Sequence, residues 1–384
     1  MTRNARARYV RKWVLIFLLV AAGGAACGCR TIGFYAQAAR GQYEVLVHRE
    51  RIEKLVADPA TPARLKTQLE LVERLRAFAR TELKLPVDAH YRDYTDVHRP
   101  CVVWNVQAAP RFSLQPVTWW YPLVGSLEYR GYFSERGARD YAAYLARKGY
   151  DVCTDGVEAY STLGWFKDPV LNTFVYRDEP ELAEVIFHEL GHQRVFAPGD
   201  TDFNEAFATT VGQEGARRWL LAANETNLYD HYLVSLKRDR QFVQLVMNTR
   251  LRLEKIYGDT LDKDGNVKAA ARLPAPPGEM EREKRAAFDD LRAEYDRLKA
   301  AWDGYDGYDD WFTHDLNNAK LNTIATYYDL VPGFKNLLKE NGGDMEKFYQ
   351  AVERLAKMPR EERRQRLRDL ARAGLVRSEI SQGR

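Results

Sequence analysis

Cysteine and histidine are scarce in this sequence, with 4 cysteines and 7 histidines among 384 residues. Cys27 and Cys29 lie in an N-terminal segment, so only Cys101 and Cys153 remain in the body of the chain. Neither of these two has the CxxC spacing of a cysteine–zinc site. In an oxidising compartment they form either one disulfide or two lone buried thiols, and the sequence leaves both open.

Acidic residues are absent before Glu44, whereas five basic residues fall within the first twelve: Arg3, Arg6, Arg8, Arg11 and Lys12. An apolar run over 13–22 follows, and then small residues over 23–26 and Cys27-Gly28-Cys29. This order is typical of an export signal. The alternative is an uncleaved membrane anchor, because residues 13–29 lie at the lower limit of a bilayer span.

The cysteines at the end of this segment make it resemble a bacterial lipoprotein signal, in which a cysteine after small residues is lipidated. Cys27 and Cys29 are both candidates, and we favour Cys29. Arg30 and Thr31 follow it instead of the Asp that favours inner-membrane retention. We therefore expect residues 1–28 to be a signal peptide. The mature protein is then an exported lipoprotein that faces the periplasm, anchored preferably in the outer membrane.

A large excess of one charge is also lacking once this segment is set aside. The whole chain has a formal charge of +4. Without the five basic residues of 1–28, 53 basic residues face 54 acidic ones. No basic stripe with interleaved aromatic residues occurs elsewhere, so we expect no nucleic-acid partner. The membrane and a peptide substrate remain as expected partners, and the oligomeric state is left open.

The body of the chain has an ordinary globular composition, with 45% hydrophobic and 29% charged residues. Apolar spacing and Gly/Pro punctuation predict strands at 101–106 and 119–124 and a loop over 258–278. The predicted helices span 34–84 with a break at Pro59 and Pro62, 135–148, 181–222 as one or two helices, 233–257, 279–302, and further stretches to about 372. The acidic turn Asp262–Gly265 fits no register of a calcium loop.

The chemical centre is His188-Glu189-Leu190-Gly191-His192. On a helix, histidines at i and i+4 project from one face and reach one metal ion. Glu189 is then well placed to take a proton from the attacking water. The apolar residues that precede His188 indicate a helix packed in the core. A chance occurrence of the motif is the competing interpretation.

Catalytic zinc typically takes three protein ligands. Glu205 follows His192 by thirteen residues and opens a second helix, after a turn that includes Asp200. We expect Asn204 or Asp202 to cap that helix. Glu214 is the rival third ligand, but it lies about two and a half turns further and points away from Glu205.

These blocks resemble the bacterial putative aminopeptidases, a family of predicted zinc lipoproteins related to the gluzincins. The resemblance covers nearly the whole mature chain. It rests above all on His188–Gln193 and Tyr327–Phe334, with further matches at Tyr129–Phe133, Ala159–Trp165, Phe203–Glu205 and Asn317–Ala319. It implies one zinc ion per chain, with His188, His192 and Glu205 as ligands and Glu189 as catalytic base. A cysteine pair of the family falls at Trp120 and Ser126 here, so that disulfide is absent.

The resemblance also implies that a downstream Tyr or His stabilises the oxyanion. Tyr328 is our choice, with Tyr327 and His314 as alternatives. Asp200, Asn204 and Glu214 are further candidates for positioning ligands or substrate. An aminopeptidase needs an acid for the substrate's ammonium group, and Glu128, Glu158 and Glu214 qualify. Residues 168–176 are either a substrate-binding edge strand or an interior strand.

We therefore expect an α+β, mainly helical, zincin-like metallopeptidase with a small mixed sheet and helical additions at both ends. The expected parts are the signal peptide 1–28, a helical segment 29–95, a catalytic core 96–222 and a helical subdomain 223–384 that completes the cleft. The expected activity is zinc-dependent peptide hydrolysis in the cell envelope, as an aminopeptidase. The alternatives are an envelope endopeptidase and a non-catalytic scaffold.

Overall fold

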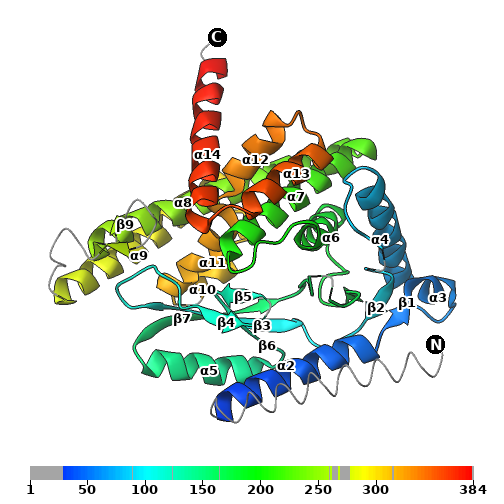
Figure 1. Cartoon of the computed structure of the whole chain (residues 1–384), viewed down its shortest axis with the longest axis horizontal. Helices are drawn as coiled ribbons and strands as arrows, with labels where there is room; N and C mark the ends of the chain where they lie inside the picture. Colours follow the sequence, from blue (N-terminus) through cyan, green and yellow to red (C-terminus); the bar gives the residue numbers. More distant parts are fainter. Residues whose placement is uncertain are drawn as a thin grey trace.

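The computed structural model describes residues 29–88, 90–122, 124–163, 165–258, 260–261, 267–268, 277–313 and 315–382. The predicted signal peptide, the Asp262–Gly265 turn and His314 lie outside these residues. Helices dominate the described parts and small sheets lie among them, which confirms the mainly helical α+β class (Figure 1). No helix within the described ranges is long and apolar enough to cross a membrane.

Most helices agree with the predicted ones in place, but the predicted segment 34–84 is divided into three helices, because β1 interrupts it at Glu50–Arg51 in addition to the break at Pro59 and Pro62. The helices are α2 (Cys29–Val47), α3 (Ile52–Ala57), α4 (Ala63–Thr81), α5 (Glu135–Arg147), α6 (Glu179–Arg194), α7 (Thr201–Ala222), α8 (Thr226–Tyr257), α9 (Pro277–Ala301), α10 (Asp309–Thr313), α11 (Asn318–Tyr328), α12 (Val331–Glu340), α13 (Met345–Ala356) and α14 (Arg360–Gln382). The segment 181–222 is thus two helices, and α8 begins seven residues before the predicted 233.

The strands are short. They are β1 (Glu50–Arg51), β2 (Asp93–Thr95), β3 (Val103–Pro110), β4 (Trp119–Tyr121), β5 (Gly125–Leu127), β6 (Arg130–Tyr132), β7 (Tyr150–Val157), β8 (Val170–Leu171), β9 (Thr260–Leu261) and β10 (Val267–Lys268). Within residues 168–176 only β8 is a strand, and its two side chains are buried against the parallel partner β2. This segment therefore offers no extended edge to a substrate.

The largest sheet has the antiparallel order β6-β3-β7, and β3 and β7 pair over eight residues from Val103↔Val157 to Pro110↔Tyr150. Helices α5 and α2 lie below this sheet in Figure 1. Their apolar residues Phe34, Ala138 and Leu145 form a core with the sheet residues Trp104 and Tyr132. The opposite face of the sheet is directed toward α6, α7 and α11.

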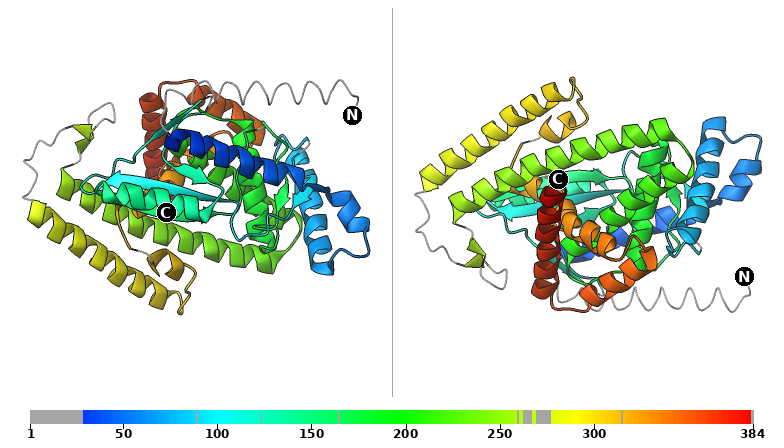
Figure 2. Two further views of the ribbon diagram at one scale, coloured as in Figure 1. Left: turned by 90° about the horizontal axis from the view of Figure 1, so that it is seen from below. Right: turned by 90° about the horizontal axis from the view of Figure 1, so that it is seen from above.

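The main core surrounds α6 and α7 and includes buried side chains from α4, α12 and α13. A separate core joins α8, α9, α10 and α11. Helices α8 and α9 run side by side and form an arm on one side of the molecule (Figure 2). Helix α11 belongs to both regions and thereby reaches the space between the sheet and α6.

Cys101 and Cys153 are both free thiols. Cys153 lies in β7, and its Sγ donates to Asp155 Oδ2 at 3.0 Å. Of the two sequence-based possibilities, the structure has the pair of lone thiols.

Candidate active site

Helix α6 carries the two histidines on one face. Its start is fixed by Asp178, whose side chain accepts a hydrogen bond from the Glu181 backbone N–H at 3.0 Å. Leu182, Ile186 and Leu190 lie fully buried on the opposite face, so the helix cannot rotate without exposing them. The imidazoles of His188 and His192 therefore project together, and their Nε2 atoms lie 3.2 Å apart.

Helix α7 brings Glu205 to the histidines because α6 and α7 pack closely. At Gly191, a Cβ would lie 3.4 Å from the Ala208 Cα, and at Gly212 it would lie 2.8 Å from the Glu184 carbonyl oxygen. Glycine at these crossings lets the helix axes approach further than larger residues would allow. Glu205, in the second turn of α7, then faces both imidazoles.

The three side chains form a compact triangle. Glu205 Oε2 lies 3.4 Å from the Nε2 atom of His188 and 3.4 Å from that of His192. Tetrahedral zinc, with ligand bonds of about 2.0–2.1 Å, places its ligand atoms about 3.3–3.4 Å from one another. The donor set of two imidazoles and one carboxylate and its spacing thus fit a single zinc ion.

Charge and burial act in opposite directions on these groups. Burial alone would raise the pKa of Glu205, but the facing imidazoles of His192 and His188 outweigh it and hold the pKa at about 2. Burial lowers the pKa of His188, whereas the Glu205 carboxylate raises that of His192. Glu205 is therefore ionised at neutral pH, as a metal ligand must be.

Glu189 follows His188 directly and is only 7% exposed. Its Oε2 has no hydrogen-bond partner among the described residues. Burial raises the pKa of Glu189 to about 8, although the charge of His192 opposes this. Such a carboxylate near a metal site is suited to exchange protons near neutral pH.

The structure places Tyr327, rather than Tyr328, against the histidines. The ring of Tyr327 stacks on that of His188, and the charge of Glu205, together with burial, raises the pKa of the Tyr327 hydroxyl far above its usual value. Tyr129, between β5 and β6, approaches the same side chains from the strands. Burial and the charge of Glu205 raise the pKa of its hydroxyl too. Tyr328 packs against the main core instead.

Helix α11 is attached to the sheet by Asn317 and Asn318, two residues of the family pattern. The Asn318 amide donates to the backbone oxygens of Pro110, Arg111 and Ser113, and that of Asn317 donates to Val152. Both asparagines therefore serve to position the helix that carries Tyr327.

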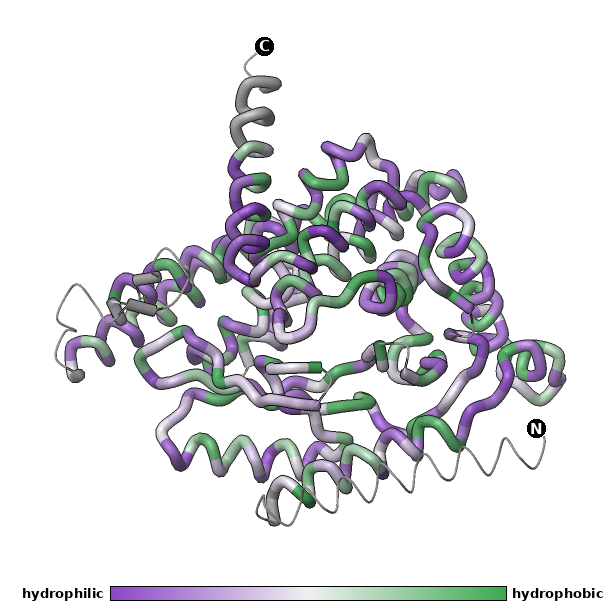
Figure 3. Tube along the Cα trace, viewed as in Figure 1, coloured by the Kyte–Doolittle hydropathy of each residue, from purple (hydrophilic) through white to green (hydrophobic). Residues whose placement is uncertain are grey.

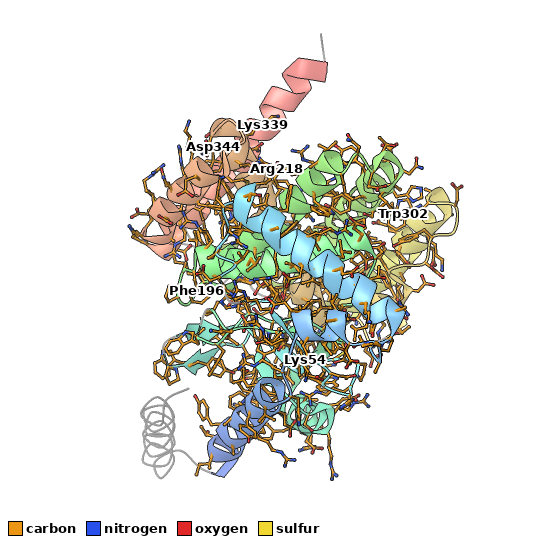
Figure 4. All side chains as sticks on the ribbon, turned by 90° about the vertical axis from the view of Figure 1, so that its right-hand side faces the viewer. Lys54, Phe196, Arg218, Trp302, Lys339 and Asp344 are labelled. Atoms are coloured by element: carbon orange, nitrogen blue, oxygen red, sulfur yellow. The ribbon has the colours of Figure 1, made fainter. Side chains whose placement is uncertain are left out.

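A cavity of about 520 Å³ opens at the metal ligands. His188, Glu189, His192, Glu205 and Tyr327 form its floor. Its walls are mostly apolar and include Leu127, Phe133, Tyr160, Leu163, Phe166 and Phe196. Figure 4 places Phe196 at the boundary between the helices and the strand-bearing part of the molecule.

One wall of this cavity, residues 161–166, is held by an internal network that sequence reasoning missed. Asp168 accepts hydrogen bonds from the Thr162 hydroxyl at 2.5 Å and from the Thr162 backbone N–H at 3.1 Å. Gln193, which follows His192 directly, donates to Asp168 at 3.2 Å, and His90 lies 3.0 Å from the same amide. The network therefore connects the metal-ligand helix to the substrate-facing wall.

A second wall is the β4–β5 hairpin, in which Trp120 pairs directly with Ser126. The two positions at which the resemblance places a cysteine pair thus face each other across this hairpin. In this chain, a hydrogen bond from the Gly199 backbone N–H to the Val124 oxygen (3.2 Å) attaches the hairpin to the α6–α7 turn.

The α6–α7 turn is also held from the C-terminal helix. Asp200 is 1% exposed, and Arg364 of α14 binds both Asp200 and Asp202 at 2.7 Å. Arg360 and Arg363 approach Asp200 within 3.5 Å. Figure 3 shows the hydrophilic character of α14 where it meets the other helices. We call Asp200, Asp202 and these three arginines the arginine clamp.

The expected cap of α7 is wrong. Asp200 occupies the N-cap position and makes no side-chain cap bond. Asn204 forms a pair of hydrogen bonds with the backbone of Ala197, at 2.8 and 2.9 Å. The arginine clamp already occupies both aspartates, so neither caps the helix. The pairing of Asn204 with Ala197 fixes the turn before the helix instead.

The remaining acidic candidates lie elsewhere. Glu214 forms ion pairs with Arg217 and Arg218, which hold its pKa below the usual range against burial, so the ligand cluster does not include it. Glu128 is buried beside Arg360, and Glu158 is paired with Arg177 at 2.7 Å.

A family model described as putative aminopeptidase matches residues 33–367 of the chain. The match covers the ligand cluster, both walls of the cavity and the arginine clamp. No curated protein and no solved structure matches the chain.

Proposed function

The chain belongs to the putative aminopeptidase family, and from that membership we propose that it is a zinc-dependent peptidase of the bacterial cell envelope. The single observation that carries the proposal is the triangle of His188, His192 and Glu205, with edges of 3.2 to 3.4 Å. This donor set is the usual one for catalytic zinc in peptidases whose third ligand is a glutamate. The family description supports the peptidase part of the proposal.

Zinc, when bound, supplies a Lewis acid that polarises a carbonyl and acidifies water. The rest of the mechanism belongs to the chain. Glu189 takes a proton from the attacking water and returns it to the leaving amine. Its free Oε2 and its buried position support this role.

Tyr327 is the better-placed donor for the oxyanion, and Tyr129 is the alternative. Both line the cavity with Glu189 and Glu205, and both have raised hydroxyl pKa values, so each stays protonated and can donate a hydrogen bond. A hydroxyl held in a buried site stabilises developing negative charge without reorganising.

The apolar cavity favours a substrate with a large hydrophobic side chain next to the scissile bond. Burial of such a side chain contributes about 1.5–3 kcal/mol. The walls around Leu163 and Phe166 supply the apolar contacts. We also propose that the protein is exported and attached to the membrane by a lipid at Cys29. The support is that residues 1–29 contain basic residues, then an apolar run, and then small residues before the cysteine.

The test is to purify the mature protein, measure its zinc content and incubate it with a peptide library in free and N-terminally acetylated forms. We expect one zinc per chain and cleavage that is lost in Glu189→Gln while zinc is retained. Cleavage of free peptides alone identifies an aminopeptidase, and cleavage of both forms identifies an endopeptidase. A zinc-loaded wild type that cleaves no peptide would contradict the proposal and favour the scaffold.

A further inference from the structure

A second cavity, of about 710 Å³, adjoins the catalytic groups. It shares His188, Glu189 and Tyr327 with the apolar cavity, but its walls are polar and come mainly from α6, α8 and α11. We call it the polar cavity. A substrate bound across His188 and Glu189 would therefore have an apolar environment on one side of the reacting bond and a polar environment on the other.

Two carboxylates in the polar cavity lack a cationic partner. Glu184 Oε2 accepts a hydrogen bond from the Tyr232 hydroxyl at 2.7 Å, and Asp239 accepts one from the Tyr308 hydroxyl. No Lys or Arg nitrogen of the described residues forms an ion pair with either carboxylate, whereas Glu158 in the same wall is paired with Arg177. Burial raises the pKa of both Glu184 and Asp239, although the charge of Lys335 opposes this.

The nearby cations are engaged elsewhere. Lys335, whose charge acts on both carboxylates, donates to the Gln213 side chain at 2.7 Å. The guanidinium of Arg238 lies over the ring of Tyr305, 4.1 Å from its centroid. Glu184 has the Gln213 side chain as a further partner, but that partner is neutral too. A half-buried carboxylate with only neutral partners gains from an added cation.

The free oxygen of Glu189 provides a second and independent observation. Glu189 is more than nine-tenths buried, its Oε2 has no hydrogen-bond partner among the described residues, and the residue lines the polar cavity. Glu189 also lines the apolar cavity, together with His188 and Tyr327. The cavity is therefore continuous with the reaction site.

Helix geometry fixes how far the carboxylate lies from the reacting bond. Glu184 precedes His188 by four residues on α6, so both lie on one face, about 6 Å apart along the axis. Consecutive Cα atoms of a peptide are about 3.8 Å apart. A group held at Glu184 therefore belongs to a residue next to the scissile bond or one position further.

We propose that Glu184, assisted by Asp239, binds a cationic group of the peptide substrate beside the scissile bond. The proposal deepens the proposed peptidase function and rests on it. The cation is either the α-ammonium of the peptide or the side chain of Lys or Arg. The first source makes the site an aminopeptidase subsite, and the second makes it a specificity pocket for basic residues.

The test compares matched peptides with wild-type protein and with Glu184→Gln. One pair differs only in a free or acetylated N-terminus, and the other only in Lys or the neutral norleucine next to the cleaved bond. We expect the cationic member of at least one pair to have the higher kcat/KM, by about 10- to 100-fold. Glu184→Gln should bring that ratio close to one, and the affected pair identifies the source of the cation.

Asp309→Asn is the control, because Asp309 also accepts a tyrosine hydroxyl, from Tyr295 at 2.6 Å, but lies outside the polar cavity. It should keep the wild-type ratio. If Glu184→Gln does not fold, Asp239→Asn takes its place and should lower the ratio in the same direction. The same peptide pairs are titrated into Glu189→Gln, so that binding is measured without turnover.

The two levels of the proposal fail separately. Cleavage with equal kcat/KM for cationic and neutral peptides overturns the cation subsite and leaves the peptidase standing. Cation-selective binding to Glu189→Gln, without any cleavage by the wild type, overturns the peptidase and leaves the subsite. If the ratio of kcat/KM for cationic over neutral peptides is unchanged in both Glu184→Gln and Asp239→Asn, other residues bind the cation and the proposal is wrong.

Discussion

The imidazole of His188 lies against the phenol ring of Tyr327, with the ring centroids 6.3 Å apart and the planes inclined by 27°. An imidazole on α6 is thereby in contact with a side chain from α11, more than a hundred residues later in the chain. Tyr327 thus lines the apolar cavity, whereas Tyr328, one position further, packs on the main core and lines the polar cavity.

Tyr327→Phe should lower kcat by about a hundredfold, because the donor that stabilises the oxyanion is removed. KM and zinc content should stay near the wild-type values, since the ring and its stacking remain. Steady-state kinetics on one cleaved peptide measures the effect. Tyr328→Phe and Tyr129→Phe are the comparisons, and a larger loss in either one reassigns the oxyanion donor.

Glu205→Ala should weaken zinc binding by more than about a hundredfold, since even outer-shell partners of zinc ligands contribute about 10- to 100-fold. Competition with a chelator of known affinity provides the measurement. Glu214→Ala is the control on the same helix, because its carboxylate is occupied by Arg217 and Arg218. Equal zinc affinity of the two variants would remove Glu205 from the ligand set.

Arg364→Ala should lower the free energy of unfolding by about 3 kcal/mol, because it takes the closest cation from two buried carboxylates. Urea unfolding checks this value. Arg372→Ala, which removes an exposed pair with Asp369 at 3.6 Å, should cost less than about 1 kcal/mol. Similar losses in the two variants would mean that the arginine clamp contributes no more than a surface pair.

Glu184 should make stability depend on pH. Burial raises its pKa from 4.5 to about 7 in the folded protein. Between these values the native state holds a proton that the unfolded chain has released. The unfolding free energy contributed by this group therefore falls as pH rises from 4.5 to 7, and it stays low above 7.

Glu184→Gln never ionises, so its stability relative to wild type should increase from pH 5 to pH 8 by on the order of 3 kcal/mol. Chemical unfolding at several pH values measures the difference. Glu214→Gln should behave oppositely, because the arginines lower the pKa of Glu214 and the stability it adds is lost as pH falls. A flat difference for Glu184→Gln would mean that this carboxyl is solvated.

The sequence was sufficient to predict most of the helices and to single out His188, His192 and Glu205 as one group, because these patterns are mostly local. Histidines at i and i+4 must share a helix face, and a glutamate on the next helix is the usual partner. The choice between Tyr327 and Tyr328 depends on the rotation of α11, in which one residue is about 100°. That rotation is fixed by Asn317 and Asn318, which bind backbone oxygens about 165 to 208 residues away.

The arginine clamp and the Asp168 network were likewise invisible in sequence. Arg364 and Asp200 are separated by 164 residues, and His90 and Gln193 by 103. Asp202 and Asn204 have the right side chains for capping, but Arg364 holds Asp200 and Asp202, and Asn204 pairs with the backbone of Ala197. Local chemistry predicts a cap, and tertiary contacts override it.

The residues of the arginine clamp are synthesised far apart in time. When a ribosome has just added Asp200 and Asp202, more than 160 residues must still follow before Arg364 exists. Until then the two carboxylates at the start of α7 lack the arginines that face them in the folded chain, and only the Asn204–Ala197 pairing and the Gly199–Val124 hydrogen bond hold the turn before Glu205. The full set of contacts that holds this turn therefore forms only after α14 has been synthesised, and a chain that ends before Arg364 lacks the arginine clamp.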